Sequence, residues 1–335
     1  MNRIFAKLLA AATAGALALS LSGAAGAQAT MKMASATIND VQHQWLKRFE
    51  AEIAPKTAGK LKIEIYPASQ LGPIPRMVEG VVLGSIEAFV TPYSFLVGTD
   101  PRFQVFDAVG VFRSAGHLNS ILADDAYRKH VLAMGEQKGL KTIGVFNNSP
   151  IIVLSKKPIR TLADFKGQKL RVFATPLQIE PIKLLGATPV PMALNEVLPA
   201  MQSGNIDGLL AGMPILTAFK YYDVAKTVTE IHTGIVVSAV VVNKRWFDGL
   251  PADVQAAILA AGAKADKEIA VESAGINARA DEAWVKNGGE IVKLAPAEQA
   301  KMMAELKALG AKLLSQNPQV KAEYDELLKV ADKYK

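Results

Sequence analysis

The chain has 335 residues, of which 21% are charged, a formal net charge of +7 and no cysteine. This length is enough for a large hydrophobic core and is more typical of two domains than of one. The composition excludes disulfides, thiolate metal sites and a cysteine nucleophile, and the scattered basic residues form no pattern typical of nucleic-acid binding. A modest positive charge suits an acidic small ligand, although solubility alone would also explain it.

The N-terminal stretch has the features of a secretory signal peptide. Arg3 and Lys7 precede an apolar run, 8–21, and small residues then end at Ala27-Gln28-Ala29. The apolar run is shorter than the roughly 20 residues that a membrane span needs. We therefore expect residues 1–29 to be cleaved and a soluble protein to be exported to the periplasm. An uncleaved membrane anchor is the alternative.

The remaining chain alternates strand-like and helix-like stretches, which is typical of an α/β protein. Strands are expected, in chain order, at 31–38, 60–67, 86–95, 140–147, 149–159, 169–174, 206–212 and 234–250. Helices are expected at 40–57, 75–84, 124–139, 178–186 and 196–205, followed by a long Ala-rich tract, 251–289, and two C-terminal helices.

Two strand-like runs, 150–154 and 236–242, lie where the chain could cross between domains. The segment between them would then form a second domain inserted in the first. We predict a lobe I of residues 30–149 plus about 236–280, and a lobe II of residues 150–235 plus about 281–335. Two crossings with a cleft between the lobes are typical of a hinged binding protein.

Arg171 is an unexpected residue in the apolar run KLRVFA, 169–174. A guanidinium stays charged at ordinary pH and is costly to bury without an anionic partner. That partner is either a carboxylate of the chain, with Glu180 and Glu196 as candidates, or a ligand.

Several segments resemble the DctP-like solute-binding proteins of tripartite ATP-independent periplasmic (TRAP) transporters. The resemblance rests most firmly on two long, adjacent segments, SKKPIRTLADFKGQKLRV (155–172) and LGATPVPMALNEVLPAMQSGNIDG (185–208), and extends to KLKIEIYPASQLG (60–72) and NKRWFDGLPADVQAAI (243–258). It implies a two-lobed α/β periplasmic binding protein with mixed sheets, two crossover strands and a long C-terminal helix. It also implies transfer of a small carboxylate to a TRAP membrane permease, without a cofactor. The absence of known catalytic motifs predicts that the chain is not an enzyme. We expect a monomer, although some members of the family form a domain-swapped dimer.

The resemblance implies that Arg171 holds the ligand's carboxylate, because a planar guanidinium matches two carboxylate oxygens. Two other polar positions of the family are lost. Pro150 stands where many members have a second arginine, and DGLLAGMP, 207–214, lacks the usual asparagine and has an extra residue.

Apolar or aromatic residues fall at or beside family pocket positions: Tyr93, Phe173, Leu194 and Met213. One carboxylate anchor in an apolar pocket predicts a monocarboxylate with an apolar or aromatic body. Asn147 and Asn148 are further candidates, since their amides could donate to the carboxylate, although they could equally cap a turn. A dicarboxylate or other acid-binding protein of another transporter class, and a periplasmic ligand sensor, are the alternative functions.

Overall fold

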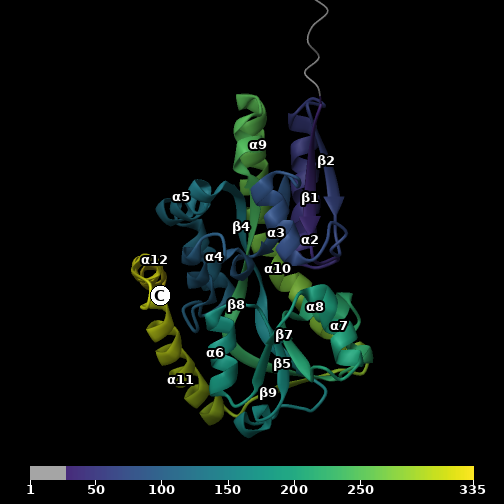
Figure 1. Cartoon of the computed structure of the whole chain (residues 1–335), viewed down its shortest axis with the longest axis vertical. Helices are drawn as coiled ribbons and strands as arrows, with labels where there is room; N and C mark the ends of the chain where they lie inside the picture. Colours follow the sequence, from purple (N-terminus) through teal and green to yellow (C-terminus); the bar gives the residue numbers. More distant parts are fainter. Residues whose placement is uncertain (1–27) are drawn as a thin grey trace, which may run out of the picture.

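The computed structural model describes residues 28–335, so the predicted signal peptide, 1–29, lies outside the described residues except for its last two. The chain folds into two lobes joined by long strands, as predicted (Figure 1). We call the part that carries β1–β3 lobe I and the part that carries β5–β7 lobe II. The boundaries proposed from the sequence stay a prediction.

One sheet runs through both lobes in the order β2-β1-β3-β8-β4-β7-β5-β6, with β9 also paired to β8. β1 is parallel to β2 and β3, whereas β8 is antiparallel to β3 and β4, so the sheet is mixed as expected. The strands are β1 (Ala29–Ser35), β2 (Leu61–Tyr66), β3 (Ala88–Pro92), β4 (Leu140–Ser155), β5 (Lys169–Val172), β6 (Thr188–Pro191), β7 (Gly208–Ala211), β8 (Thr227–Asn243) and β9 (Glu290–Lys293).

β4 and β8 are the two crossover strands. The runs 140–147 and 149–159, predicted as separate strands, form the single strand β4, which pairs with β8 along its length. The register between them shifts at Asn147/Ser149 and again at Pro150/Ile152. Irregular pairing of this kind accommodates a proline, which has no N–H to donate to a regular ladder. β8 begins at Thr227, ahead of the predicted run, and its first half, TVTEIHTG, has few apolar residues, so the apolar pattern did not reveal it.

Helices cover both faces of the sheet: α2 (Val41–Ile53), α3 (Ile74–Leu83), α4 (Ala115–Ala123), α5 (Asp125–Ala133), α6 (Pro176–Leu184), α7 (Leu194–Gln202), α8 (Met213–Ala218), α9 (Lys244–Asp248), α10 (Ala252–Lys286), α11 (Pro296–Leu314) and α12 (Pro318–Lys333). The sequence analysis missed α4, α8, β6 and β9, all of them short. It also extended the strand predicted over 234–250 too far, because β8 ends at Asn243, whose side chain accepts from the N–H of Trp246 and begins the helix α9. The helix predicted over 124–139 ends at Ala133, because Gly135 adopts a left-handed conformation with φ 85°. Within the described residues, no helix is long and apolar enough to cross a membrane.

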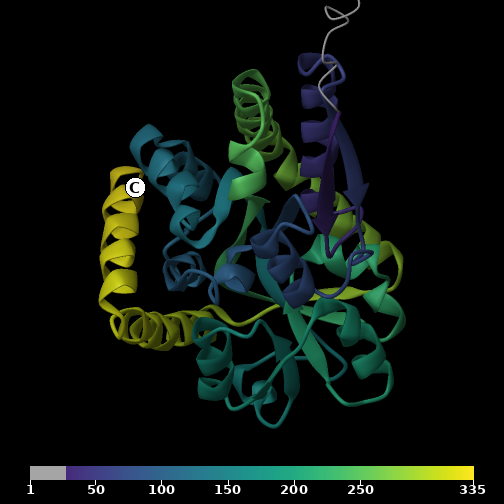
Figure 2. The same cartoon turned by 45° about the horizontal axis from the view of Figure 1, so that its top comes forward.

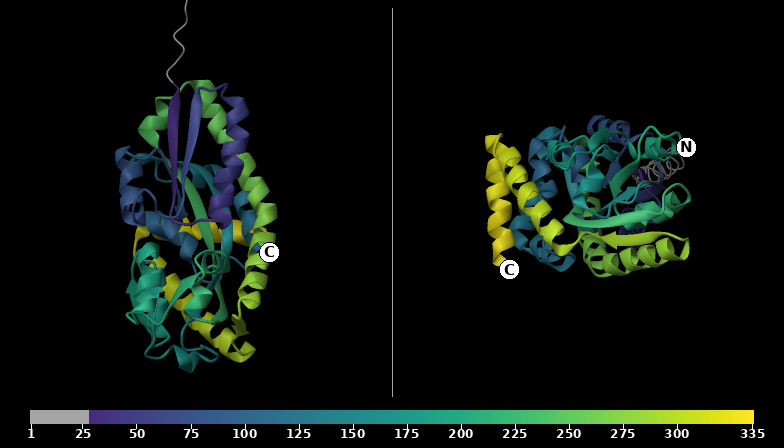
Figure 3. Two further views of the ribbon diagram at one scale, coloured as in Figure 1. Left: turned by 90° about the vertical axis from the view of Figure 1, so that its right-hand side faces the viewer. Right: turned by 90° about the horizontal axis from the view of Figure 1, so that it is seen from below.

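The core of lobe I is built around Trp45 of α2. Its ring stacks on Phe49 and Phe146, with centroids 5.3 and 6.0 Å away. The indole N–H donates to Asp266 of α10, 2.6 Å away. α10 runs along both lobes (Figure 3), and packs on α2 and β4 as well as on α8 of lobe II.

The C-terminal helices divide between the lobes. α11 packs on α6 and β8 in lobe II, where the Gln299 side chain donates to the carbonyl of Ile231, 2.7 Å away. α12 then turns back to lobe I and lies beside α4 and the 3₁₀ segment η3 (Pro101–Asp107) (Figure 2). There the ring of His130 contacts Glu323, with Nε2 2.7 Å from the carboxylate. α12 therefore contacts lobe I, and the assignment of all of 281–335 to lobe II stays a prediction.

Candidate ligand-binding site

A closed cavity lies between the two lobes at the ends of β3 and β5. Lobe I and β8 supply Ala36, Thr37, Gln42, Ile74, Thr91, Pro92, Phe95 and Val236, and lobe II supplies Arg171, Phe173, Leu194, Ala211, Gly212 and Ile215. Its volume is about 30 Å³, room for little more than one water molecule. An organic ligand does not fit into this volume, so we expect the lobes to separate when a ligand enters and to lie further apart when it is bound.

Arg171 lies on β5, between Val190 of β6 and Leu209 of β7, which explains the apolar run around it. The residue is only 1% exposed. Its Nε donates to the backbone carbonyl of Met192, 3.1 Å away, and its Cζ lies 4.8 Å from the centroid of the Phe173 ring. Nη2 is buried and has no hydrogen-bond partner within residues 28–335. Burial lowers the pKa of Arg171 to about 10, and Tyr221 acts in the opposite direction.

The two carboxylates considered as internal partners of Arg171 are engaged elsewhere. Glu180 contacts Lys183, with Oε1 2.7 Å from Nζ, and Glu196 accepts from the backbone N–H of Ala193, 3.1 Å away. A buried cation without a carboxylate of the chain beside it is energetically unfavourable and attracts an anion. A negatively charged group would compensate this charge, and a carboxylate matches the fork of the guanidinium.

Most of the cavity wall around this cation is apolar. Phe95 of lobe I packs on Phe173 of lobe II, with ring centroids 4.5 Å apart. Because this aromatic pair joins the two lobes beside Arg171, it forms a contact that exists only when the cleft is closed. Leu194, at the start of α7, and Ile215 of α8 complete the wall on the side of lobe II.

Lobe I adds polar groups that the sequence analysis missed. Thr91, near the end of β3, is 1% exposed, and its Oγ1 has no hydrogen-bond partner in the described part of the chain. Gln42 donates to Ser238 Oγ, 3.1 Å away. The carboxyl end of a strand in an α/β sheet is a usual place for ligand contacts, and this rule alone would have pointed to Thr91.

Arg171, Phe173 and Leu194, three of the residues predicted from the sequence, come together in this cavity. Tyr93, in contrast, lies in the core of lobe I. Its ring stacks on Phe106 with centroids 4.2 Å apart, and the residue is 1% exposed. The backbone leaves β3 at Pro92 and enters a 3₁₀ turn at Tyr93, which directs this side chain inward.

The two predicted amides are buried in the hinge region. Asn147 Nδ2 lies 3.5 Å from Ser273 Oγ, and Asn148 Nδ2 donates to Ser238 Oγ at 3.1 Å. Ser238 is also the partner of Gln42, so Asn148 lies one side chain behind the cavity wall. Met213 lines a separate cavity with Pro150, His232 and other residues. The described residues contain no cluster of three or more His, Asp or Glu side chains suited to a metal ion.

Comparisons with known proteins agree with this architecture. The sequence profile of the bacterial extracellular solute-binding protein family 7 (DctP) matches residues 33–317. The chain belongs to this family. It is a solute-binding protein of the TRAP transporter type, and its relatives are transport proteins that bind a solute outside the cytoplasm.

Family 7 members of known name include clear relatives of this protein. The 2,3-diketo-L-gulonate-binding periplasmic protein YiaO of Escherichia coli (strain K12) is 30% identical over 227 residues, 68% of this chain and 69% of that protein. The C4-dicarboxylate-binding periplasmic protein DctP of Rhodobacter capsulatus is 32% identical over 211 residues, 62% of each chain. A TRAP periplasmic solute-binding protein from Desulfovibrio salexigens, solved with bound orotic acid, is 25% identical with a TM-score of 0.84, covering 91% of this chain and 98% of that one.

Proposed function

We propose that this solute-binding protein captures a monocarboxylate with an apolar or aromatic body in the periplasm and delivers it to a TRAP membrane permease. Export would follow cleavage of residues 1–29, and the chain would act as a monomer. The observation that carries the proposal is the buried Nη2 of Arg171, which faces a mostly apolar cavity without an acid of the described chain beside it. The ligand's carboxylate would supply the missing anion.

The lining residues favour one carboxylate over two. Arg171 is the single charged side chain among the residues that line this cavity in the described part of the chain. A second carboxylate would have to be buried against neutral side chains, which is unfavourable. Pro150, at the position where the resemblance implies a second arginine, lies in β4 at a register shift and lines the separate cavity that contains Met213. The relative from Desulfovibrio salexigens was solved with bound orotic acid, a planar acid with one carboxylate and a polar ring, which supports a single carboxylate in the ligand but not an apolar body.

Phe173 and Leu194 would contact the ligand's apolar body from lobe II, and Phe95 would close over it from lobe I. Closure follows from these contacts, since a ligand stabilises the closed conformation only through interactions that this conformation adds. The predicted ligand contacts of Tyr93, Asn147, Asn148 and Met213 gain no support from the positions described above.

A binding screen tests the proposed function. Mature protein, residues 30–335, would be unfolded and refolded to remove captured ligand, and then melted with panels of monocarboxylates and dicarboxylates. A ligand at one hundred times its Kd stabilises the folded state by about 2.7 kcal/mol, which gives a clear rise in Tm. We expect hits among apolar and aromatic monocarboxylates. Hits among dicarboxylates alone would contradict the ligand class, and the absence of any hit would contradict acid binding.

A further inference from the structure

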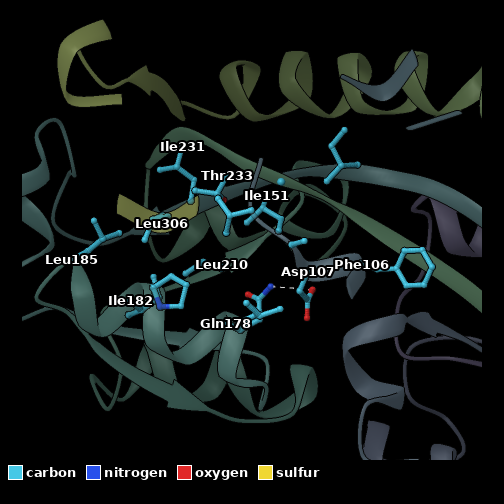
Figure 4. A pocket seen from close by; sticks show the side chains of 16 residues that line it. Phe106, Asp107, Ile151, Gln178, Ile182, Leu185, Leu210, Ile231, Thr233 and Leu306 are labelled. Atoms are coloured by element: carbon cyan, nitrogen blue, oxygen red, sulfur yellow. Dashed lines mark hydrogen bonds between the residues drawn. The ribbon is translucent and has the colours of Figure 1, made fainter. Parts of the chain in front are cut away.

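Asp107 provides a second contact between the lobes, away from the ligand cavity. It ends the segment η3 of lobe I and faces α6 of lobe II across another small cavity of about 30 Å³ (Figure 4). None of the described residues that line this cavity also lines the cavity of Arg171. Its wall comes from both lobes and includes Phe106 and Gln178.

The carboxylate of Asp107 accepts hydrogen bonds from both lobes. Ser94 of lobe I donates to Oδ1 at 2.6 Å. From lobe II, Gln178 Nε2 donates to the same oxygen and Thr175 Oγ1 donates to Oδ2, both at 3.3 Å. Thr175 and Gln178 are buried, so separation of the lobes would break both bonds and expose their polar groups to water.

A backbone contact lies beside this group. The N–H of Gly110, three residues after Asp107, donates to the carbonyl of Thr233 in β8, 3.1 Å away. The segment after η3 is therefore attached to the crossover strand at the point where Asp107 meets α6. This attachment keeps the carboxylate close to β8, so a rotation of lobe II relative to lobe I would change the two longer hydrogen bonds.

We propose that Asp107, Thr175 and Gln178 form a clasp that stabilises the closed conformation, so that ligand affinity is set partly outside the ligand cavity. The inference rests on the proposed function, because the clasp acts on the same closure that the ligand drives. A contact made only in the closed conformation raises the fraction of molecules able to hold ligand, and the apparent Kd falls by the same factor.

Variants of the lobe II donors test the clasp without touching the ligand cavity. Gln178→Met and Thr175→Val keep the side-chain size but remove a donor, which leaves the carboxylate less satisfied in the closed form. We expect each to weaken binding of the best acid from the screen about 5- to 10-fold, mainly through faster dissociation. Glu180→Gln, on the same helix but bonded to Lys183, is the matched control and should leave the Kd unchanged.

A double-mutant cycle tests whether Asp107 is the group through which Gln178 affects ligand affinity. With Asp107→Ala in the background, Gln178→Met should have little further effect on the Kd, because the acceptor is already gone. Equal effects of Gln178→Met with and without Asp107 would contradict the clasp, as would wild-type affinity of both donor variants. Thermal melts of each apo variant establish that the fold is intact. If Asp107→Ala does not fold, the affinity of Thr175→Val, which keeps Asp107, becomes the test of the clasp.

A measurement of lobe separation distinguishes failure of the clasp from failure of the proposed function. The chain has no cysteine, so Leu83→Cys in α3 and Leu184→Cys in α6, both exposed positions on different lobes, give one pair of sites for spin labels. Gln178→Met should move the distance distribution toward longer distances. If no acid binds the wild type, the proposed function fails. Even then, identical spin-label distance distributions for the wild type and Gln178→Met would contradict the clasp independently of ligand binding.

Discussion

Arg171 in lobe II and Arg128 in lobe I are two inward-facing arginines with opposite surroundings. Arg128 Nη2 pairs with Asp266, a nearly buried carboxylate that also accepts from the backbone N–H of Val145 at 3.0 Å. Arg171 has a backbone carbonyl and an aromatic ring beside it, and its Nη2 has no partner in the described residues. The first arginine completes a structural ion pair, whereas the second leaves a positive charge in a cleft. From this difference we expect Arg128 to matter for the stability of the fold and Arg171 for the binding of a ligand.

The largest effect should follow from Arg171→Ala. Loss of a charge-assisted bidentate contact in a dry site costs about 2–5 kcal/mol of binding free energy, so calorimetric titration should show nearly complete loss of acid binding. The apo fold should keep or gain stability, because an uncompensated buried cation is removed. Arg160→Ala, which removes an exposed arginine paired with Glu290, is the control and should bind as wild type does.

At Arg128, the arginine paired with Asp266, we expect the reverse: a loss of stability with little change in ligand binding. Asp266→Ala leaves Arg128 and the Trp45 N–H without their acceptor, and should lower the free energy of unfolding by about 3 kcal/mol. Urea denaturation measures this loss. Once folded, the variant should bind the acid with nearly wild-type affinity. A variant that kept its stability but lost binding would reverse the roles assigned to the two arginines.

The pH dependence of binding should report on Asp107. Burial raises its pKa to about 6 from an ordinary 3.8, and Ser94, Gln178 and Thr175, which face it, are all neutral. Separation of the lobes would expose this carboxyl to water and return its pKa toward 3.8, so the closed form binds a proton more tightly and closure is favoured as pH falls through 6 toward 4. At pH 7 the hydrogen bonds from Gln178 and Thr175, which lower the pKa, offset part of the cost of burying the ionised carboxylate. Affinity for a strong acid ligand should therefore rise several-fold between pH 7 and pH 5. The same titration of Asp107→Ala should be flatter, and an equally steep profile would assign the effect to another group.

The smallest effect is expected at Thr91. Thr91→Val keeps the shape of the side chain and removes a buried hydroxyl that has no partner in the described structure. The free energy of unfolding of the apo protein should therefore rise by about 1 kcal/mol, which a small increase in Tm would report. The affinity of the same variant for different acids then shows which ligands contact Thr91. Affinity for a purely apolar acid should be unchanged, whereas an acid with a hydroxyl or oxo group that meets Thr91 should bind more weakly.

The sequence by itself determined the fold class and the family, and it singled out Arg171 as the residue on which the proposed binding depends. These conclusions rest on local patterns: a charged residue within an apolar strand, and two long adjacent motifs between residues 155 and 208. The short elements were missed because a strand or helix of four to nine residues carries little periodicity of its own. The continuity of β4 through Pro150 was also hidden, because proline normally ends a regular strand.

Only the tertiary structure decided which side chains share the cavity with Arg171. Thr91 and Phe95 reach it and Tyr93 does not, although all three lie in one short segment. The direction of a side chain after a strand end depends on how the following turn packs, which no local pattern encodes. The same holds for α12, which returns to lobe I, and for Asp107, which meets Gln178 only because the lobes close. Contacts between distant segments depend on the packing of whole lobes, so they are absent from any single stretch of sequence.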